Sequence, residues 1–300
     1  ALNDKDKINK LVEGQDLWII GSCRGGGAGS GASAIFSKIS KNSGNLTYGI
    51  FTLPFEFEGE RKMEVALKSL EKIKTCLDAY SVIPNERIFQ IIDKNTPLNS
   101  ALSIINKKIA DNLEGLIEMI FYPGLINIDF ADLKTILAGK GKLSYLNTAD
   151  IETLNKEDSI KNMISSPLYP YTLKGAKGIL YNIKSGPDLK LSDVSNISKT
   201  ILESVNKQAK IIFGINQSKN LKDEIKITLL AVGCVGNFFQ PKTSPMRIVK
   251  ETITKIASVK KGKDKTQERK KEEKKPEEKP EKKDAEKEIK KPATKKSKIK

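Results

Sequence analysis

The sequence has no histidine among its 300 residues, and this absence excludes several kinds of chemistry. A Ser-His-Asp triad, a Cys-His pair and every imidazole metal site need a residue that the chain lacks. The three cysteines, Cys23, Cys76 and Cys234, lie far apart without C-x-x-C spacing, so neither a zinc site nor a disulfide framework is supported. Catalysis must therefore use carboxylates, amides, hydroxyls, lysines or a bound cation.

Long hydrophobic runs are also missing. No apolar stretch approaches the roughly twenty residues that span a bilayer, and no signal peptide is recognisable, so we expect a cytoplasmic protein. From Lys260 onward the chain is almost only Lys, Glu, Asp and Pro. Such a segment cannot bury enough apolar surface to offset chain entropy, which predicts a disordered tail. The formal net charge of +16 is partly a property of this tail, and it fits nucleic acid, anionic membrane or acidic protein partners.

Hydrophobic periodicity predicts alternating strands and helices in the first hundred residues, the arrangement of a parallel sheet. A long helical pattern follows at about 97–119, and the second part predicts a smaller mixed sheet with helices on one side. The expected strands are Trp18 to Ile20, Leu46 to Leu53, Tyr80 to Ile83, Lys177 to Ile183, Lys210 to Ile215 and Glu224 to Val232. The other expected helices are Ala32 to Ser43, Met63 to Leu77, Asp129 to Leu137, Lys156 to Ile164 and Ser192 to Ser204.

A glycine loop lies between the first expected strand and the first expected helix. Its glycines are Gly25, Gly26, Gly27, Gly29 and Gly31. Glycines in this position let backbone amides approach an anion closely and direct a helix N-terminus at it, which is how phosphate is held without cationic side chains. A flexible turn is the plainer interpretation. The loop matches neither the P-loop nor the dinucleotide-binding pattern.

Two carboxylates, Asp129 and Asp132, follow the long helical pattern and lie within an otherwise apolar run. Their spacing alone favours a helix N-cap with an acidic partner in the first turn. The residues around them indicate a different role. Asn127-x-Asp129-Phe-Ala-Asp132 matches the catalytic loop of FtsZ, the bacterial tubulin-like GTPase of cell division, which the whole segment from Lys7 to Cys234 resembles.

Several separate motifs carry this resemblance in the family's order. Gly25 to Gly31 is similar to the tubulin signature Gly-Gly-Gly-Thr-Gly-Thr-Gly, with Ala28 and Ser30 at the two Thr positions. Leu53 to Lys62 is similar to the family's Pro-Phe-x-Phe-Glu-Gly-x-x-Arg, and Val82 to Glu86 to its Ile-Pro-Asn-Asp. Segments at Ile164 to Leu168, Gly175 to Asn182, Gly186 to Leu189 and Ile212 to Gly214 resemble the second domain.

The resemblance implies a tubulin/FtsZ-like α/β fold in four parts. Residues 1–96 would be the remainder of a parallel-sheet GTP-binding domain that is truncated at its N-terminus. Its opening strand and first phosphate loop would lie upstream of Ala1. Residues 97–120 would be a central helix and 121–236 a smaller mixed α/β domain. Residues 237–300 would be a linker and a disordered tail.

The resemblance also implies a set of nucleotide-binding residues. These are Gly25, Gly26, Gly27, Gly29, Ser30, Gly31, Glu58 at the ribose, Lys62 where the family has Arg, and Asn106 at the guanine. The plainer interpretation of Glu58 and Lys62 is solvated charge at the start of a helix. The plainer interpretation of Asn106 is an ordinary helical amide. The family usually has Ala-Gly-Met where this chain has Ser22, Cys23 and Arg24, and Arg24 would offer the nucleotide a charge.

For catalysis, the resemblance assigns Asp129 and Asp132, with Asn127 as a positioning group, to the nucleotide of the next subunit. The substrate would be GTP with Mg²⁺ held mainly by the nucleotide, and no metal site in the protein itself. The chain would polymerise head to tail at the division site. Its tail would contact membrane-tethering adaptors or anionic lipid, with a solvated spacer as the plainer interpretation, and nucleic acid is not an expected partner. A filament partner without turnover, an inactive fragment and a basic nucleic-acid-binding protein remain alternatives.

Overall fold

The computed structural model describes residues 4–93, 95–139, 141–152, 156–218, 221 and 224–236. All of them fall within residues 1–240, which form one compact unit. The predicted linker and tail at 237–300 lie outside the described residues. Within the described part no helix is both long enough and apolar enough to cross a membrane.

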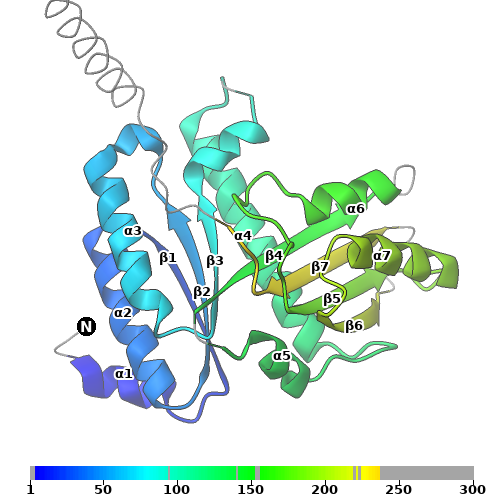
Figure 1. The fold of residues 1–300 in the computed structure, drawn as a ribbon, viewed down its shortest axis with the longest axis horizontal. Helices are drawn as coiled ribbons and strands as arrows, with labels where there is room; N and C mark the ends of the chain where they lie inside the picture. The colour runs from blue at the N-terminus through cyan, green and yellow to red at the C-terminus, as the bar shows by residue number, and fades with distance from the viewer. Residues whose placement is uncertain are drawn as a thin grey trace, which may run out of the picture. The chain divides into compact units, whose positions relative to one another are not determined.

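A seven-stranded sheet with the order β1-β2-β3-β4-β7-β5-β6 runs through the described residues (Figure 1). Strands β1 to β4 are parallel, β7 is antiparallel to both of its neighbours, and β5 and β6 are parallel. The strands are β1 Leu17–Cys23, β2 Leu46–Leu53, β3 Ala79–Pro84, β4 Lys142–Ile151, β5 Gly178–Ser185, β6 Lys210–Gln217 and β7 Ile225–Val232. The predicted combination of a parallel sheet with a mixed α/β part is confirmed.

Helices lie on both faces of the sheet. The helices are α1 Lys5–Val12, α2 Gly27–Asn42, α3 Glu60–Lys74, α4 Leu98–Phe121, α5 Phe130–Leu137, α6 Lys156–Ile164 and α7 Leu191–Glu203, with the 3-10 turns η2 Glu56–Glu58 and η3 Asn85–Gln90. Strand β2 is buried along its whole length. Its side chains alternate between a core shared with α3 and a core shared with α4 and α5, because successive residues of a strand face opposite ways.

The same alternation corrects the prediction that helices cover only one side of the second part. On β5, Tyr181 packs in the core with α6 and α7, whereas its neighbour Leu180 packs in the core with α4 and α5. On β7, Leu229 and Leu230 divide in the same way. Strands β5 and β7 each contain consecutive apolar residues, Ile179-Leu180-Tyr181 and Leu229-Leu230-Ala231-Val232, which is typical of a sheet covered on both faces.

The two parts of the sheet meet where β3 and β4 pair through only two residue pairs. Beyond these pairs, hydroxyl groups bridge the diverging strands. The hydroxyl of Tyr171 accepts a hydrogen bond from the backbone N–H of Val82 (3.0 Å) and donates one to the carbonyl oxygen of Ser144 (2.8 Å). The hydroxyl of Ser81 also donates to the Ser144 carbonyl (2.7 Å). Buried side-chain bonds therefore join the strands where the ladder ends.

Candidate functional site

Helix α2 begins inside the glycine loop, five residues earlier than the sequence predicts. Gly26 is its N-cap and Gly27 its first residue, and no side chain caps the amides of the first turn. Gly29, Ser30 and Gly31 are therefore helical residues rather than parts of a loop, which corrects the predicted start at Ala32. The prediction failed because glycine is a poor helix former, so the composition of this segment hides its helical turns.

Close packing explains the glycine at position 29. A Cβ atom built on Gly29 would lie 2.0 Å from the carbonyl oxygen of Cys23, at the end of β1. Only glycine lets the first turn of α2 pack so tightly against this strand. Gly25, with φ +101°, provides the turn that leads from the strand to the helix, and its N–H donates to the hydroxyl of Ser30 (3.0 Å).

A cavity of about 610 Å³ opens at these amides, at the carboxyl ends of β1 and β2. Its lining comes from the first turn of α2, the segment after β2, and the start of α4. The lining residues are Cys23, Arg24, Gly26, Gly27, Ala28, Gly29, Thr52, Pro54, Phe55, Phe57, Glu58, Lys62, Asn85, Leu98 and Leu102. Free amides at a helix N-terminus beside an apolar wall suit a ligand with an anionic group and a flat ring.

The structure thus brings together five of the nine predicted nucleotide-binding residues. Gly26, Gly27, Gly29, Glu58 and Lys62 line the cavity. Gly25, Ser30 and Gly31 belong to the same turn without lining it. Asn106 is exposed on α4, and it follows the lining residues Leu98 and Leu102 at four-residue spacing on the same helical stripe. It therefore extends that stripe away from the phosphate end of the cavity.

Glu58 and Lys62 are paired with each other at the cavity wall. The ammonium group of Lys62 donates a hydrogen bond to Glu58, which lowers the pKa of the Glu58 carboxyl below its usual value. The other carboxylate oxygen of Glu58 accepts from the backbone N–H of Phe55 (2.8 Å). A hydroxyl-bearing ligand would find an acceptor here that is already held in place.

Arg24 is among the lining residues, but it offers the cavity almost none of the charge that the sequence suggested. It is 2% exposed, and its guanidinium lies 4.0 Å from the centroid of the Phe51 ring, beneath α2. Sequence reasoning also missed the apolar wall of Phe55 and Phe57, whose rings stack 4.8 Å apart. The motif Pro-Phe-x-Phe contains these two residues, but a match to a family motif does not by itself predict an apolar wall.

The acidic segment lies at the other end of the sheet. Helix α5 packs against β2 near its beginning, among Leu46 and Tyr48, whereas Thr52 near its end lines the cavity. Helix α4 connects the two places: Leu98 in its first turn lines the cavity, and its 24 residues extend about 36 Å before the acidic segment follows. Asn127, Asp129 and Asp132 do not line the cavity of their own chain.

Asp129 and Asp132 form a reciprocal cap at the start of α5. Asp129 Oδ1 accepts from the N–H of Asp132 (2.7 Å), and Asp132 Oδ2 accepts from the N–H of Asp129 (3.3 Å). Asn127 Oδ1 accepts from the N–H of Gly124 (2.7 Å). The cap expected from the spacing alone is therefore present. It also fixes the two carboxylates at the surface, with Asp129 exposed and Asp132 partly so.

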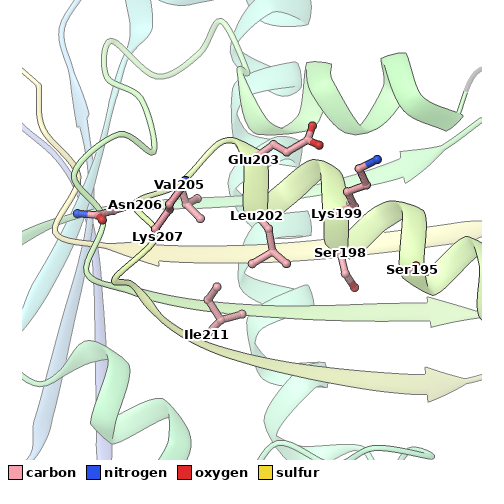
Figure 2. A pocket seen from close by; sticks show the side chains of 9 residues that line it. All are labelled: Ser195, Ser198, Lys199, Leu202, Glu203, Val205, Asn206, Lys207 and Ile211. Carbon is pink, nitrogen blue, oxygen red and sulfur yellow. The ribbon is translucent and has the colours of Figure 1, made fainter.

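A second hollow, of about 690 Å³, lies between α7 and β6, where Leu202 and Ile211 point toward one another (Figure 2). It contains none of the predicted site residues. Among the described residues no group of three or more Cys, Asp or Glu side chains is arranged to hold a metal ion. The three cysteines, all described, are free thiols. The cavity at the glycine turn is therefore the candidate site.

An α/β sheet with this cavity at the carboxyl ends of its parallel strands defines a phosphate-binding protein of the nucleotide-binding class. Comparison with known proteins gives the family. Residues 1–93 match the GTPase domain of the Tubulin/FtsZ family, and residues 148–235 match the C-terminal domain of the FtsZ family. The chain belongs to the FtsZ/tubulin family.

Solved structures agree with this assignment. An FtsZ dimer from M. jannaschii is 31% identical, with a TM-score of 0.70 over 77% of this chain and 67% of that one. A mutant of FtsZ from M. jannaschii is also 31% identical, with a TM-score of 0.71 over 78% and 70% of the two chains. CetZ from Methanosaeta thermophila shares the fold, with a TM-score of 0.64 and 19% identity over 90% and 75%.

Proposed function

We propose that the chain is an assembly-coupled GTPase that polymerises head to tail. GTP occupies the cavity, with its phosphates at the first turn of α2 and its base toward Leu98, Leu102 and Asn106. Asp129 and Asp132 of the next copy orient or deprotonate the attacking water, and Asn127 helps to position it. The observation that carries the proposal is the separation of the acids from their own cavity by the length of α4.

Assembly is supported by apolar surface at both ends of α4. Phe121, Tyr122 and Leu125, each at least 63% exposed, precede the acids at one end. Phe57 and Leu98, 67% and 53% exposed, flank the cavity at the other. Two different surfaces that meet head to tail form a heterologous contact, which propagates into a filament unless it closes into a ring. One of the similar structures is itself an FtsZ dimer.

Mg²⁺, when bound, would screen the charge of the triphosphate. Its ligands would come mainly from phosphate oxygens and water, since Mg²⁺ keeps much of its hydration and the described residues provide no cluster of carboxylates for it. The chain's own part is to hold the phosphates with the α2 amides, to keep Glu58 as an acceptor, and to present the acids of the neighbouring copy.

The cellular proposal follows from the family: filaments in the cytoplasm that form a ring at the division site. The predicted contacts of the basic tail with membrane-tethering adaptors or anionic lipid lie outside the described residues. A filament partner without turnover remains the second candidate. It is favoured by Ala28, where the family signature has Thr, and by the use of Asp129 and Asp132 as a helix cap.

Mixing two damaged variants tests whether one active site needs two copies. Asp132→Ala keeps the cavity and loses the acid. Gly27→Asp keeps the acids and puts a carboxylate where phosphate would bind, at a position where a Cβ atom has no neighbour within 4 Å. We expect no turnover from either variant alone. An equimolar mixture should recover about a quarter of the wild-type rate, because one interface in four combines intact halves.

Turnover by wild type should rise cooperatively above a threshold concentration, because the site forms only on assembly. Full activity of Asp132→Ala alone, or a wild-type rate per molecule that is independent of concentration, would rule out catalysis between copies. Absence of turnover in wild type despite GTP binding would favour the filament partner.

A further inference from the structure

Arg24 is a buried cation directly behind the phosphate end of the cavity. It follows β1, and its Nη1 donates to the hydroxyl of Ser33 (2.9 Å) and to the carbonyl oxygen of Gly29 (3.2 Å). Both acceptors belong to the first two turns of α2, whose first amides line the cavity. The charge of Arg24 therefore lies beneath the helix end that would receive an anion.

No carboxylate balances this charge among the described residues. Arg24 forms no ion pair with them, and its Nε and Nη2 have no hydrogen-bond partner there. Burial lowers the pKa of Arg24 to about 10, so the guanidinium stays charged at neutral pH. The face of the Phe51 ring stabilises the cation in part. A buried charge without a paired anion is costly, and a bound anion nearby would relieve that cost.

We propose that Arg24 is a buried counter-charge for the phosphate chain of the ligand, and that it makes the cavity selective for ligands with more negative charge. This proposal rests on the proposed function, in which the cavity holds GTP. The charge acts through the first turn of α2 without direct contact, in an interior where charges are poorly screened. It adds to the positive end of the α2 dipole, so binding strengthens from mono- to di- to triphosphate.

The contacts of Arg24 distinguish this role from simple support of the turn. The Gly29 carbonyl also accepts a hydrogen bond from the hydroxyl of Ser33, so it keeps a donor when Arg24 is replaced. Arg24→Met replaces the guanidinium by an unbranched apolar side chain that can pack on Phe51. It removes the unpaired charge and leaves the turn with its other bonds.

The test measures the binding of GTP, GDP, GMP and inorganic triphosphate to the full chain by titration calorimetry. For Arg24→Met we expect affinity for GTP and triphosphate to fall at least about tenfold and affinity for GMP less than about threefold. Arg24→Lys, which keeps the charge and loses the planar fork, should preserve the order of affinities. The ligand-free Arg24→Met protein should melt no lower than wild type.

An equal loss for all four ligands, no loss for any, or a lower melting temperature of ligand-free Arg24→Met would overturn the proposal. Arg24→Gln provides a second neutral variant. If both neutral variants fail to fold, the guanidinium is a structural requirement and the proposal is wrong. If wild type binds none of the ligands, the proposed function fails as well, whereas wild-type binding that Arg24→Met reproduces overturns only the role of Arg24.

Discussion

The cavity at the glycine turn and the acidic segment before α5 differ in the chemical groups that they present. The cavity is lined by backbone amides and apolar rings, and of the two cations in its lining Lys62 is paired with Glu58 and Arg24 is 2% exposed. The acidic segment presents side-chain carboxylates at the surface, where their own helix holds them in a reciprocal cap. One region offers amides that suit an anion, and the carboxylate in its lining, Glu58, is paired with Lys62. The other has carboxylates and no cavity, so each lacks what the other provides.

The strongest test of this difference between the two regions separates GTP binding from GTP turnover. Asp132→Ala should leave GTP affinity within about twofold of wild type and lower turnover by at least a hundredfold, because in the proposed mechanism the acid acts on the neighbour's nucleotide only. Lys134→Ala, on the same helix, is the matched control and should change neither. Affinity and turnover come from titration calorimetry and phosphate release. A parallel loss of affinity and turnover would mean that the acid belongs to the binding site of its own chain.

A second test concerns the packing that builds the cavity. In Gly29→Ala the new Cβ atom meets the backbone of Cys23 at 2.0 Å, so the strand or the helix must move. We expect the free energy of unfolding to fall by at least about 2 kcal/mol, with loss of GTP binding. Gly31→Ala, two residues along the same helix, has no neighbour within 4 Å and should raise it by about 0.5–1 kcal/mol. Urea denaturation measures both.

The same two glycine variants test how tightly the turn packs against β1. If the urea concentration at the midpoint of unfolding is the same for Gly29→Ala and wild type, the close approach of α2 to β1 is wrong. If Gly31→Ala abolishes GTP binding while it stabilises the protein, Gly31 contacts the nucleotide directly, and the predicted binding set extends beyond the lining of the cavity.

The sequence predicted elements with clear periodicity and missed those without it. The expected strand Leu46 to Leu53 matches β2 at both ends, and Lys156 to Ile164 matches α6. The strand β4, Lys142–Ile151, was missed because its polar residues Ser144, Asn147 and Thr148 interrupt the apolar pattern. In the structure these residues are buried, and their hydrogen bonds link β4 to neighbouring elements. Such pairing depends on residues distant in sequence.

The candidate site was predictable only where a motif named its residues. The residues of the glycine turn signal a phosphate loop by themselves, whereas Glu58 and the acidic segment were assigned only because they resemble family motifs. The start of α2 at Gly27 could not, since the propensity of glycine argues against a helix there. The inward course of the Arg24 side chain was equally hidden, because its contact with Phe51 joins the residue after β1 to β2. Tertiary packing decided both.

The smallest effect concerns the carboxylate of the cavity. The hydrogen bond from Lys62 lowers the pKa of Glu58 below 4.5, so the pair adds stability above that pH and loses it as the pH falls through the folded-state value. For a pair at the surface this is about 0.3–0.5 kcal/mol. Glu58→Gln should remove this acid dependence, measured as the change in the free energy of unfolding between neutral pH and about pH 3.5.

Glu64→Gln is the matched control, because Glu64 and Lys68 form the same four-residue pair on α3 without lining the cavity. Both variants should lose a similar small stability, yet only Glu58→Gln should weaken GTP binding, by about three- to tenfold, since Glu58 is the acceptor expected at the ribose. The loss should shrink for the 2′,3′-dideoxy nucleotide, which lacks the hydroxyls. An equal loss of affinity for both nucleotides would mean that Glu58 does not contact the ribose. The pair of Glu58 and Lys62 would then have only a structural role in the cavity.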